Sequence, residues 1–233
     1  MHHYVTIPKI LHHVWLGKEQ IPINLQKCIK TCYDVHSEWK HMFWTDDNLP
    51  NMEPFVEEYD IDNNYARKSD LVRIMALYHY GGVYLDTDVE CIKPIENLLT
   101  GYKFIVATEA GTPGEFNPGT EHINNAVIAS TKSNNILIEL INQVQKNYKR
   151  INITNKEPLD YVAKLAGPPV FNKMSNIIRE DEYSKIYPYE YFYPLHYVDK
   201  ISVDKWKIPS DKQKLDKKTH MIHHFAASWY NQK

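Results

Sequence analysis

Hydrophobic positions along the chain form short apolar runs that alternate with longer stretches of helical periodicity. Runs with the length and the β-branched or aromatic content of strands are Ile7–Leu16, Trp39–Thr45, Val83–Leu85, Phe104–Ala107 and Ala126–Ala129. Helices are predicted where apolar residues recur every three or four positions, at about Pro22–Tyr33, Arg67–Tyr80 and Asn134–Tyr148. Strands that alternate with helices favour an α/β fold with a mostly parallel central sheet flanked by helices.

The pair of glycines between a predicted helix and a predicted strand determines where Asp86 lies. Gly81 and Gly82 are expected to end the preceding helix at Tyr80, because glycine readily adopts the backbone conformation found just past a helix C-terminus. The short strand that follows leads directly into Asp86. Asp86 is therefore expected at the C-terminal edge of a strand, where open α/β sheets bind their ligands.

Length and charge limit the classes of protein that need to be considered. With 233 residues the chain suits one large α/β domain, and we expect residues 1–233 to form a single domain. The net charge of −2 gives no electrostatic basis for binding nucleic acid. No apolar run reaches the length of a membrane span, and the N-terminus lacks the basic start and apolar stretch of a signal peptide. A cytoplasmic protein is expected, with peripheral contact to a membrane left open.

The cysteines suggest a reducing environment. The chain has three, Cys28, Cys32 and Cys91, and an odd, small number argues against a disulfide framework. Cys28 and Cys32 could share one face of a helix, but no second cysteine pair follows that would complete a metal site with them. Free thiols are therefore expected.

The segment Asp86-Thr87-Asp88 is the strongest candidate for chemistry. Two carboxylates that flank one residue directly after an apolar strand can converge on a single divalent cation, and such hard oxygen ligands suit Mg²⁺ or Mn²⁺. A bound ion of this kind can hold a diphosphate and neutralise the charge that develops on a departing phosphate. The alternative is a surface turn with two solvated aspartates.

A second group of polar residues precedes this segment on the predicted helix. Ser69, Asp70 and Arg73 lie close to the predicted helix start, and residues three positions apart can project from the same side. Asp70 and Arg73 could thus act together on a ligand. The alternative is an N-cap at Ser69 followed by an ordinary ion pair.

Four segments carry a resemblance to a known family. Residues 66–95, ARKSDLVRIMALYHYGGVYLDTDVECIKPI, resemble the Asp-x-Asp core of sugar-transferase family 32. That family includes the yeast initiating α-mannosyltransferase, α-1,4-galactosyltransferases and bacterial capsular transferases, and the catalytic domains of clostridial glucosylating toxins share its core. IPKILHHVWLG, HINNAVIAS and MIHHFAASW resemble its opening strand, its asparagine-containing strand and its closing segment. The four segments follow the family's order from residue 7 to residue 229.

The resemblance implies a fold of the GT-A type, sugar transfer with retention of anomeric configuration, and a role for each matching residue. Asp86, Asp88 and His223 would hold the metal, and Asp70 and Arg73 would contact the sugar and phosphates of the donor beside Ser69. Trp15 would stack on the nucleobase, Tyr84 would line the donor pocket, Asn124 would lie beside the anomeric carbon, and Ser228 and Trp229 would close over the phosphates. The implied catalytic residues are Asn124, Asp70 and Arg73.

Some of these residues have structural alternatives. Trp15 could be a core residue, and Asn124 could belong to a turn. His223 and His224 would point to opposite sides if they lie on a strand, so only one of them should face the ion, and His223 is favoured.

The favoured function is therefore a retaining, Mn²⁺- or Mg²⁺-dependent glycosyltransferase. Its favoured donor would be a UDP-sugar, with GDP-mannose as the alternative, and its acceptor a glycan, a polysaccharide or another hydroxyl compound. One alternative is a phosphohydrolase of the haloacid-dehalogenase kind that uses Asp86 as its nucleophile. Such enzymes carry their Asp-x-Asp on an early strand, whereas here it follows 85 residues. A second alternative is a module that binds sugar nucleotides or glycans without turnover.

Overall fold

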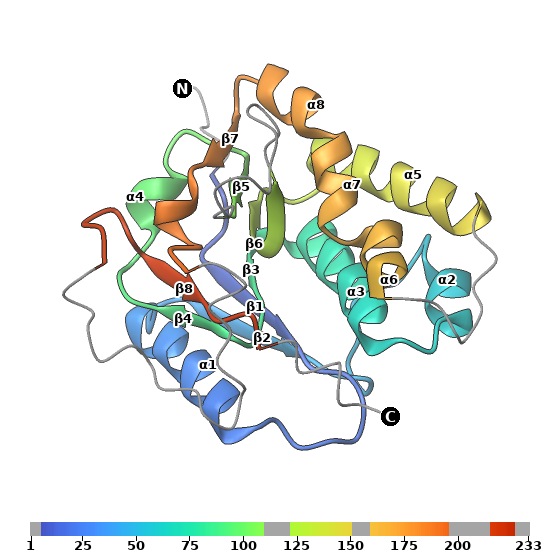
Figure 1. Ribbon diagram of the computed structural model, residues 1–233, viewed down its shortest axis with the longest axis horizontal. Coiled ribbons are helices and arrows are strands. Elements are labelled where there is room, and N and C mark those ends of the chain that lie inside the picture. The colour runs from blue at the N-terminus through green and yellow to red at the C-terminus, as the bar shows by residue number, and fades with distance from the viewer. Residues whose placement is uncertain (1–5, 110–121, 151–158, 196–214, 227–233) are drawn as a thin grey trace.

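A six-stranded sheet forms the centre of the protein (Figure 1). The computed structural model describes residues 6–109, 122–150, 159–195 and 215–226. In spatial order the strands are β2 (Lys40–Trp44), β1 (Ile10–Val14), β3 (Gly82–Leu85), β6 (Ile123–Ser130), β5 (Phe104–Thr108) and β7 (Ser184–Tyr187). β1 is parallel to β2 and β3, and β5 is parallel to β7, whereas β6 is antiparallel to both of its neighbours. The predicted α/β fold with a mostly parallel sheet is confirmed.

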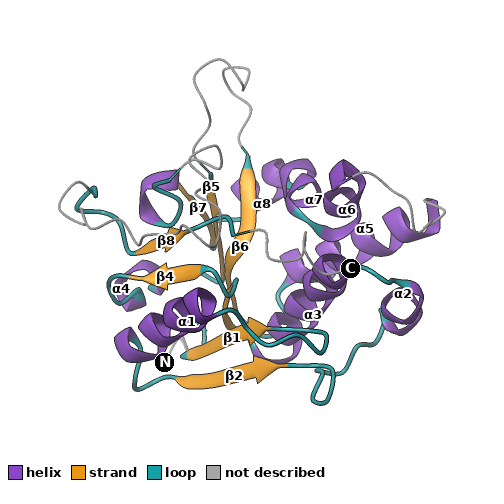
Figure 2. Cartoon of the chain, turned by 60° about the horizontal axis from the view of Figure 1, so that its bottom comes forward, coloured by secondary structure: helices purple, strands orange, loops and turns teal. Residues whose placement is uncertain are grey.

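A smaller sheet of two strands lies beside the large one. β4 (Val89–Cys91) pairs antiparallel with β8 (Met221–His223), so it joins the middle of the chain to its C-terminal part. Figure 2 shows these two strands above α1 (Ile23–Val35), on the side of the molecule away from α3 (Tyr65–Tyr80). The turn Asp86–Asp88 connects β3 with β4 and thus lies where the two sheets meet.

The helices form two groups on opposite sides of the sheet, as both views show (Figures 1 and 2). One group contains α2 (Val56–Ile61), α3, α5 (Asn135–Arg150), α6 (Leu159–Ala166), α7 (Pro168–Lys173) and α8 (Ser175–Glu180). On the other side lie α1, α4 (Glu96–Leu99) and the small sheet, with the 3-10 turn η1 (Tyr189–Tyr191) after β7. Each side buries its own hydrophobic cluster against the sheet. Within the described ranges no helix combines the length and apolar character needed to cross a bilayer.

Helix α3 begins slightly earlier than its apolar periodicity predicts. Its N-cap is Asn64, whose side-chain oxygen accepts hydrogen bonds from the backbone N–H groups of Ala66 and Arg67 at 3.0 and 3.1 Å. Ser69, the alternative N-cap, lies inside the helix, so that alternative is wrong. A polar cap sets this boundary, and the spacing of apolar residues does not locate it.

The end of α3 is set by two glycines, as predicted. Gly81 has φ 64° and donates its N–H to the carbonyl of Leu77 at 2.8 Å, which closes the helix. Gly82 has φ 106°, and a Cβ atom at this position would lie only 2.6 Å from the carbonyl oxygen of Ile10. Only glycine allows β3 to approach β1 this closely at its first residue, and β3 in turn positions Asp86.

The expectation that all the cysteines are free is wrong for two of them. Cys32 of α1 and Cys91 of β4 form a disulfide across a sequence separation of 59 residues, and Cys28 is free and buried. The count of cysteines does not reveal this pairing, because it follows from the packing of α1 against β4, which no local pattern encodes. The bond ties α1 to the strand that leaves the Asp86–Asp88 turn.

We predict that the oxidised protein contains one reactive thiol after denaturation and the reduced protein three. The chain-entropy model gives a disulfide that closes a loop of this length a stabilisation of about 4 kcal/mol. Thiol alkylation in denaturant with mass spectrometry, with and without reductant, tests the pairing. Unfolding free energies under the same two conditions test its contribution.

The matched controls are Cys28→Ala and Cys91→Ala. Reductant should lower the unfolding free energy of Cys28→Ala as it does that of the parent, and should leave that of Cys91→Ala unchanged. Three alkylated thiols in the unreduced parent would contradict the pairing.

Candidate active site

The turn Asp86–Asp88 is held at the end of β3 by backbone hydrogen bonds. The N–H of Asp86 donates to the carbonyl of Ala126 in β6 at 2.9 Å, and the N–H of Val89 donates to the carbonyl of Asp86 at 3.0 Å. The side chain of Asp86 keeps 27% of its surface exposed and that of Asp88 keeps 11%. The two carboxylates therefore do not form a solvated surface turn, and Asp86 is the more accessible of them.

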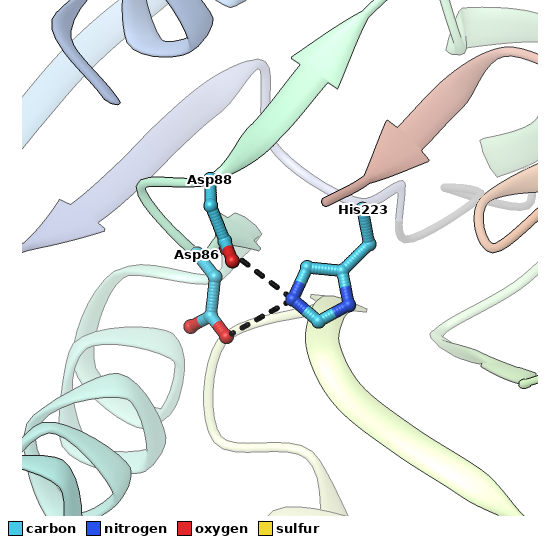
Figure 3. Close-up of side chains that lie close together, drawn as sticks. All are labelled: Asp86, Asp88 and His223. Atoms are coloured by element: carbon cyan, nitrogen blue, oxygen red, sulfur yellow. Dashed lines mark ion pairs between the residues drawn. The ribbon is translucent and has the colours of Figure 1, made fainter. Parts of the chain in front are cut away.

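His223 joins these carboxylates from the far end of the chain. In the β4–β8 pairing Val89 lies opposite His223, which brings the imidazole over the turn. His223 Nε2 lies 3.2 Å from Asp88 Oδ1 and 4.0 Å from Asp86 Oδ2 (Figure 3). One ligand atom from each of the three residues falls within 4.8 Å of the others. Two carboxylates and an imidazole at this spacing fit a divalent cation such as Mn²⁺.

The adjacent histidines point to different partners. His224 Nε2 lies 3.2 Å from Glu90 Oε2, and both of these side chains are almost fully buried. The backbone N–H of His224 donates to the carbonyl of Asp88 at 3.1 Å, which adds a further link between β8 and the turn. His223, and not His224, therefore faces the two aspartates, in the arrangement that the alternation of strand side chains predicts.

The charges at Asp88 and His223 support each other. Burial alone would raise the pKa of Asp88, but the charge and hydrogen bond of His223 outweigh it and lower that pKa to about 2. The backbone N–H of Ala226, which donates to Asp88 Oδ2 at 2.7 Å, acts in the same direction. Burial disfavours protonated His223, yet the Asp88 carboxylate raises its pKa above the usual value. The site thus holds a negative charge at Asp88 and attracts positive charge.

Arg73 lies between two carboxylates on the other side of Asp86. Its Nη2 is 3.1 Å from Asp70 Oδ1 and 3.2 Å from Asp86 Oδ1, and its Nη1 donates to the carbonyl of Asn125 at 2.7 Å. The Asp70–Arg73 contact predicted from their spacing is present, and Arg73 also contacts the Asp86–Asp88 turn. Burial opposes the charged form of Arg73, but Asp86 outweighs it, so the pKa of Arg73 is raised and the group stays cationic.

Asp70 is buried, and its charge is balanced by its neighbours. Desolvation raises its pKa to about 6, although Arg73 opposes this shift and Asn125 donates from Nδ2 to Asp70 Oδ1 at 2.8 Å. Ser69 is half-buried, and its carbonyl accepts a long hydrogen bond of 3.4 Å from Arg73 Nε. Ser69 and Asp70, which lie about one helical turn before Arg73, therefore both contact its guanidinium, Ser69 through its backbone carbonyl.

Tyr84 and Trp15 differ in accessibility. Tyr84 is 1% exposed, its ring lies under the Arg73 guanidinium at 4.4 Å, and its hydroxyl donates to Asp86 Oδ1 at 2.6 Å. Trp15 follows β1 at the same edge of the sheet and is half-buried, outside both hydrophobic clusters. Its indole N–H donates to the carbonyl of Glu19 at 2.7 Å. Trp15 is therefore not a core tryptophan. Tyr84, in contrast, is buried, and its hydroxyl hydrogen-bonds the carboxylate of Asp86.

Asn124 lies at the start of β6 with both ends of its amide engaged. Its Oδ1 accepts from the N–H of Ala126 at 2.8 Å, and its Nδ2 donates to Glu109 Oε2 at 2.8 Å. Tyr193, which sequence reasoning missed, accepts a hydrogen bond from the N–H of Val127 at 2.9 Å. The ring of Tyr193 meets that of His223 edge to face, with 5.7 Å between their centroids. Tyr193 lies in the segment after β7, outside the four segments that carry the family resemblance, so no motif in the sequence pointed to it.

Two predicted site residues fall beyond the part of the chain that the structure describes. Ser228 and Trp229 lie in the range 227–233, so their expected position over the phosphates stays a prediction. The described chain ends at Ala226, whose N–H is bonded to Asp88.

This geometry has counterparts among known proteins. A family model described as "Glycosyltransferase sugar-binding region containing DXD motif" matches residues 22–105, which include Asp70, Arg73 and the Asp86–Asp88 turn. Over residues 22–105 the chain is thus similar to this family of DXD glycosyltransferases. The match favours sugar transfer over the phosphohydrolase alternative and confirms the resemblance stated above.

Individual relatives agree with this assignment. Over 199 residues the chain is 25% identical to inositol phosphoceramide mannosyltransferase 2 of Schizosaccharomyces pombe, an alignment that covers 76% of this chain and 54% of the relative. It spans 28% and 40% of the length of two other curated relatives, so it corresponds to about half of these proteins or less.

Solved structures support the fold. The PaToxG glycosyltransferase has a TM-score of 0.54 at 21% identity, covering 75% of this chain and 71% of that one. The UDP-bound glycosyltransferase domain from the YGT toxin has a TM-score of 0.53 at 12% identity, covering 79% and 80%. The predicted GT-A fold is confirmed.

We predict that Asp88→Asn removes metal-dependent ligand binding and leaves the fold intact, because one ligand loses its charge without changing size. In a thermal-shift measurement with Mn²⁺ and UDP, the parent should be stabilised, by about 2.7 kcal/mol when the ligand is at roughly 100 times its Kd. The variant should show little stabilisation. Asp34→Asn, at an exposed residue of α1, is the control and should behave like the parent. Equal stabilisation of Asp88→Asn and parent would refute the metal site.

We also predict that Trp15→Ala weakens nucleotide binding with little effect on stability. Loss of a base-stacking ring costs about 1–3 kcal/mol of binding free energy. Trp39→Ala provides the contrast, because Trp39 is 5% exposed and its truncation should lower the free energy of unfolding by about 3–5 kcal/mol. Titration calorimetry with UDP and chemical unfolding on both variants would test this. A Trp15→Ala protein that loses stability like Trp39→Ala and keeps its UDP affinity would contradict the stacking role.

Proposed function

We propose that residues 1–233 form a single transferase domain that moves a sugar from a nucleotide-sugar donor to a hydroxyl group of a glycan or polysaccharide. The reaction would proceed with retention of anomeric configuration and with Mn²⁺ or Mg²⁺ bound. The observation that carries this proposal is the convergence of Asp86, Asp88 and His223, whose ligand atoms lie within 4.8 Å of one another, in a chain that is similar to the DXD family over residues 22–105.

The three residues would hold the ion against the diphosphate of the donor. The bound ion would supply a Lewis acid that neutralises charge on the departing diphosphate. Mn²⁺ fits this set better than Mg²⁺, because it accepts an imidazole together with carboxylates, whereas Mg²⁺ favours oxygen ligands alone. Tyr84 and Arg73 both bind Asp86 Oδ1, which leaves Asp86 Oδ2 directed at His223 and available to a cation or its water.

Asp70 and Arg73 would contact the donor itself. Both described contacts of Asp70 go to Oδ1, so Oδ2 is left to accept a hydrogen bond from a sugar hydroxyl. Arg73 remains cationic between two carboxylates and would add positive charge next to the donor phosphates. Ser69 lies one residue before Asp70 and would border the same pocket.

Trp15 would supply a flat face for the nucleobase at the C-terminal edge of β1. A uridine nucleotide is favoured as donor because the YGT toxin domain, which shares the fold, is described as UDP-bound. Mannose is a candidate sugar because the fission-yeast relative is named as a mannosyltransferase. Ser228 and Trp229 would close over the phosphates once the donor is bound.

Retention is proposed to arise by attack on the same face of the sugar from which the diphosphate leaves. The bond between the anomeric carbon and the diphosphate oxygen breaks, and its electron pair stays with the diphosphate. The acceptor oxygen forms the new bond to the anomeric carbon and passes its proton to the departing diphosphate oxygen. Asn124 would lie beside the anomeric carbon; its neutral amide is a poor nucleophile.

The test is a donor screen with product analysis. Purified protein with Mn²⁺ should release nucleotide from one of UDP-glucose, UDP-galactose, UDP-N-acetylglucosamine and GDP-mannose, with a UDP-sugar expected. NMR of the product from an α-linked donor should show an α-linkage. A β-linked product would refute retention, and donor binding without turnover would support the non-catalytic module. A phosphoenzyme at Asp86 would instead support the phosphohydrolase.

A further inference from the structure

A carboxylate near the metal-binding residues has no role in the mechanism above. Glu109 follows β5 directly, and its backbone N–H donates to the carbonyl of His122 at 2.8 Å, which fixes it opposite the first residues of β6. Its Oε2 accepts the hydrogen bond from Asn124 Nδ2 at 2.8 Å. It is half-buried, so the carboxylate is positioned by the protein and not free in solvent.

Glu109 differs from the other carboxylates of the site in its partners. Asp70 and Asp86 contact Arg73, and Asp88 contacts His223. Among the described residues the carboxylate of Glu109 accepts its hydrogen bond from the uncharged amide of Asn124, and no cationic side chain pairs with it. A carboxylate held by a neutral donor keeps its full negative charge available for another positive centre.

Glu109 is held next to the transferred sugar if Asn124 lies beside the anomeric carbon, as the proposed function has it, because Asn124 donates to its carboxylate. Asn124 Oδ1 accepts a hydrogen bond from the N–H of Ala126, and the carbonyl of Ala126 accepts from the N–H of Asp86. A continuous chain of hydrogen bonds thus links Glu109 to the first residue of the Asp86–Asp88 turn.

We propose that Glu109 is a catalytic residue whose carboxylate stabilises the positive charge that develops on the anomeric carbon and ring oxygen of the transferred sugar, while Asn124 orients it. This inference rests on the proposed function and deepens it. Glu109 forms no bond: the diphosphate leaves with the electron pair, the acceptor oxygen attaches to the anomeric carbon, and its proton goes to the diphosphate. Asn124 is then mainly a positioning residue, because Ala126 and Glu109 occupy both ends of its amide.

The test compares Glu109→Gln, which keeps the acceptor for Asn124 and removes the charge, with Glu109→Asp, which keeps the charge and moves it. Loss of one preorganised electrostatic group costs about 10²–10³-fold in kcat, so we expect a fall of that order in Glu109→Gln. Glu109→Asp should retain more activity than Glu109→Gln. The affinity of both variants for UDP with Mn²⁺ should match that of the parent, because UDP lacks the transferred sugar that Glu109 is proposed to act on.

Glu182→Gln, at an exposed residue of the turn before β7, is the matched control and should keep the parent's kcat. A kcat for Glu109→Gln equal to that of this control, or equal losses in the Gln and Asp variants, would overturn the role of the charge. A glycosyl adduct on Glu109 in intact-protein mass spectrometry would overturn it as well, in favour of a nucleophile. If the parent binds UDP but turns over no donor, the proposed function itself fails, which is a different outcome from an active parent with an active Glu109→Gln variant.

Discussion

The buried charge of Arg73 holds the site together. Asp70 and Asp86 are brought close to each other, and two partly desolvated carboxylates at this distance would repel strongly without a cation between them. Arg73 fills that place, and its remaining nitrogens bond the carbonyls of Asn125 and Ser69. Helix α3, the turn after β3 and the start of β6 are thereby tied to one guanidinium. Arg73 together with the carboxylates of Asp70, Asp86 and Asp88 carries a net negative charge. This charge favours the binding of a divalent cation.

The antiparallel direction of β6 places its first residues beside the Asp86–Asp88 turn. The neighbouring β1 and β3 run parallel, so their C-terminal ends lie at one edge of the sheet, whereas β6 is antiparallel and begins there. Its first residues therefore lie beside the end of β3, where Asp86 follows. The pairing of β5 with β6 shifts register between Ile105 and Ala107 in this same region, as strands often do next to active sites. Inside the irregular stretch the side chains of Asn124 and Tyr193 satisfy the N–H groups of Ala126 and Val127.

The local parts of this arrangement could be predicted from sequence, and the long-range parts could not. The glycine pair, the strand after it and the Asp70–Arg73 spacing are set by neighbours along the chain, so the pattern of residues encodes them. Strand alternation separated His223 from His224, but only the β4–β8 pairing shows what each one faces. The Cys32–Cys91 bond has the same origin, since it depends on α1 packing against β4. Trp15 and Trp39 look alike in sequence, and burial alone distinguishes the half-exposed ring from the core one.

The two consecutive asparagines of β6, Asn124 and Asn125, donate hydrogen bonds to two different carboxylates. Asn125 donates to Asp70, on the side where Arg73 and α3 lie, and Asn124 donates to Glu109 at the end of β5. Each amide therefore fixes one carboxylate. The backbone carbonyls of Asn125 and of Ala126, the next residue of β6, accept hydrogen bonds from Arg73 and from the N–H of Asp86. A neutral amide can position a carboxylate without cancelling its charge, whereas an arginine or lysine would do both. In the proposed mechanism, Arg73 neutralises Asp86, whereas Glu109, held by a neutral amide, keeps its negative charge for a sugar that becomes positive during transfer.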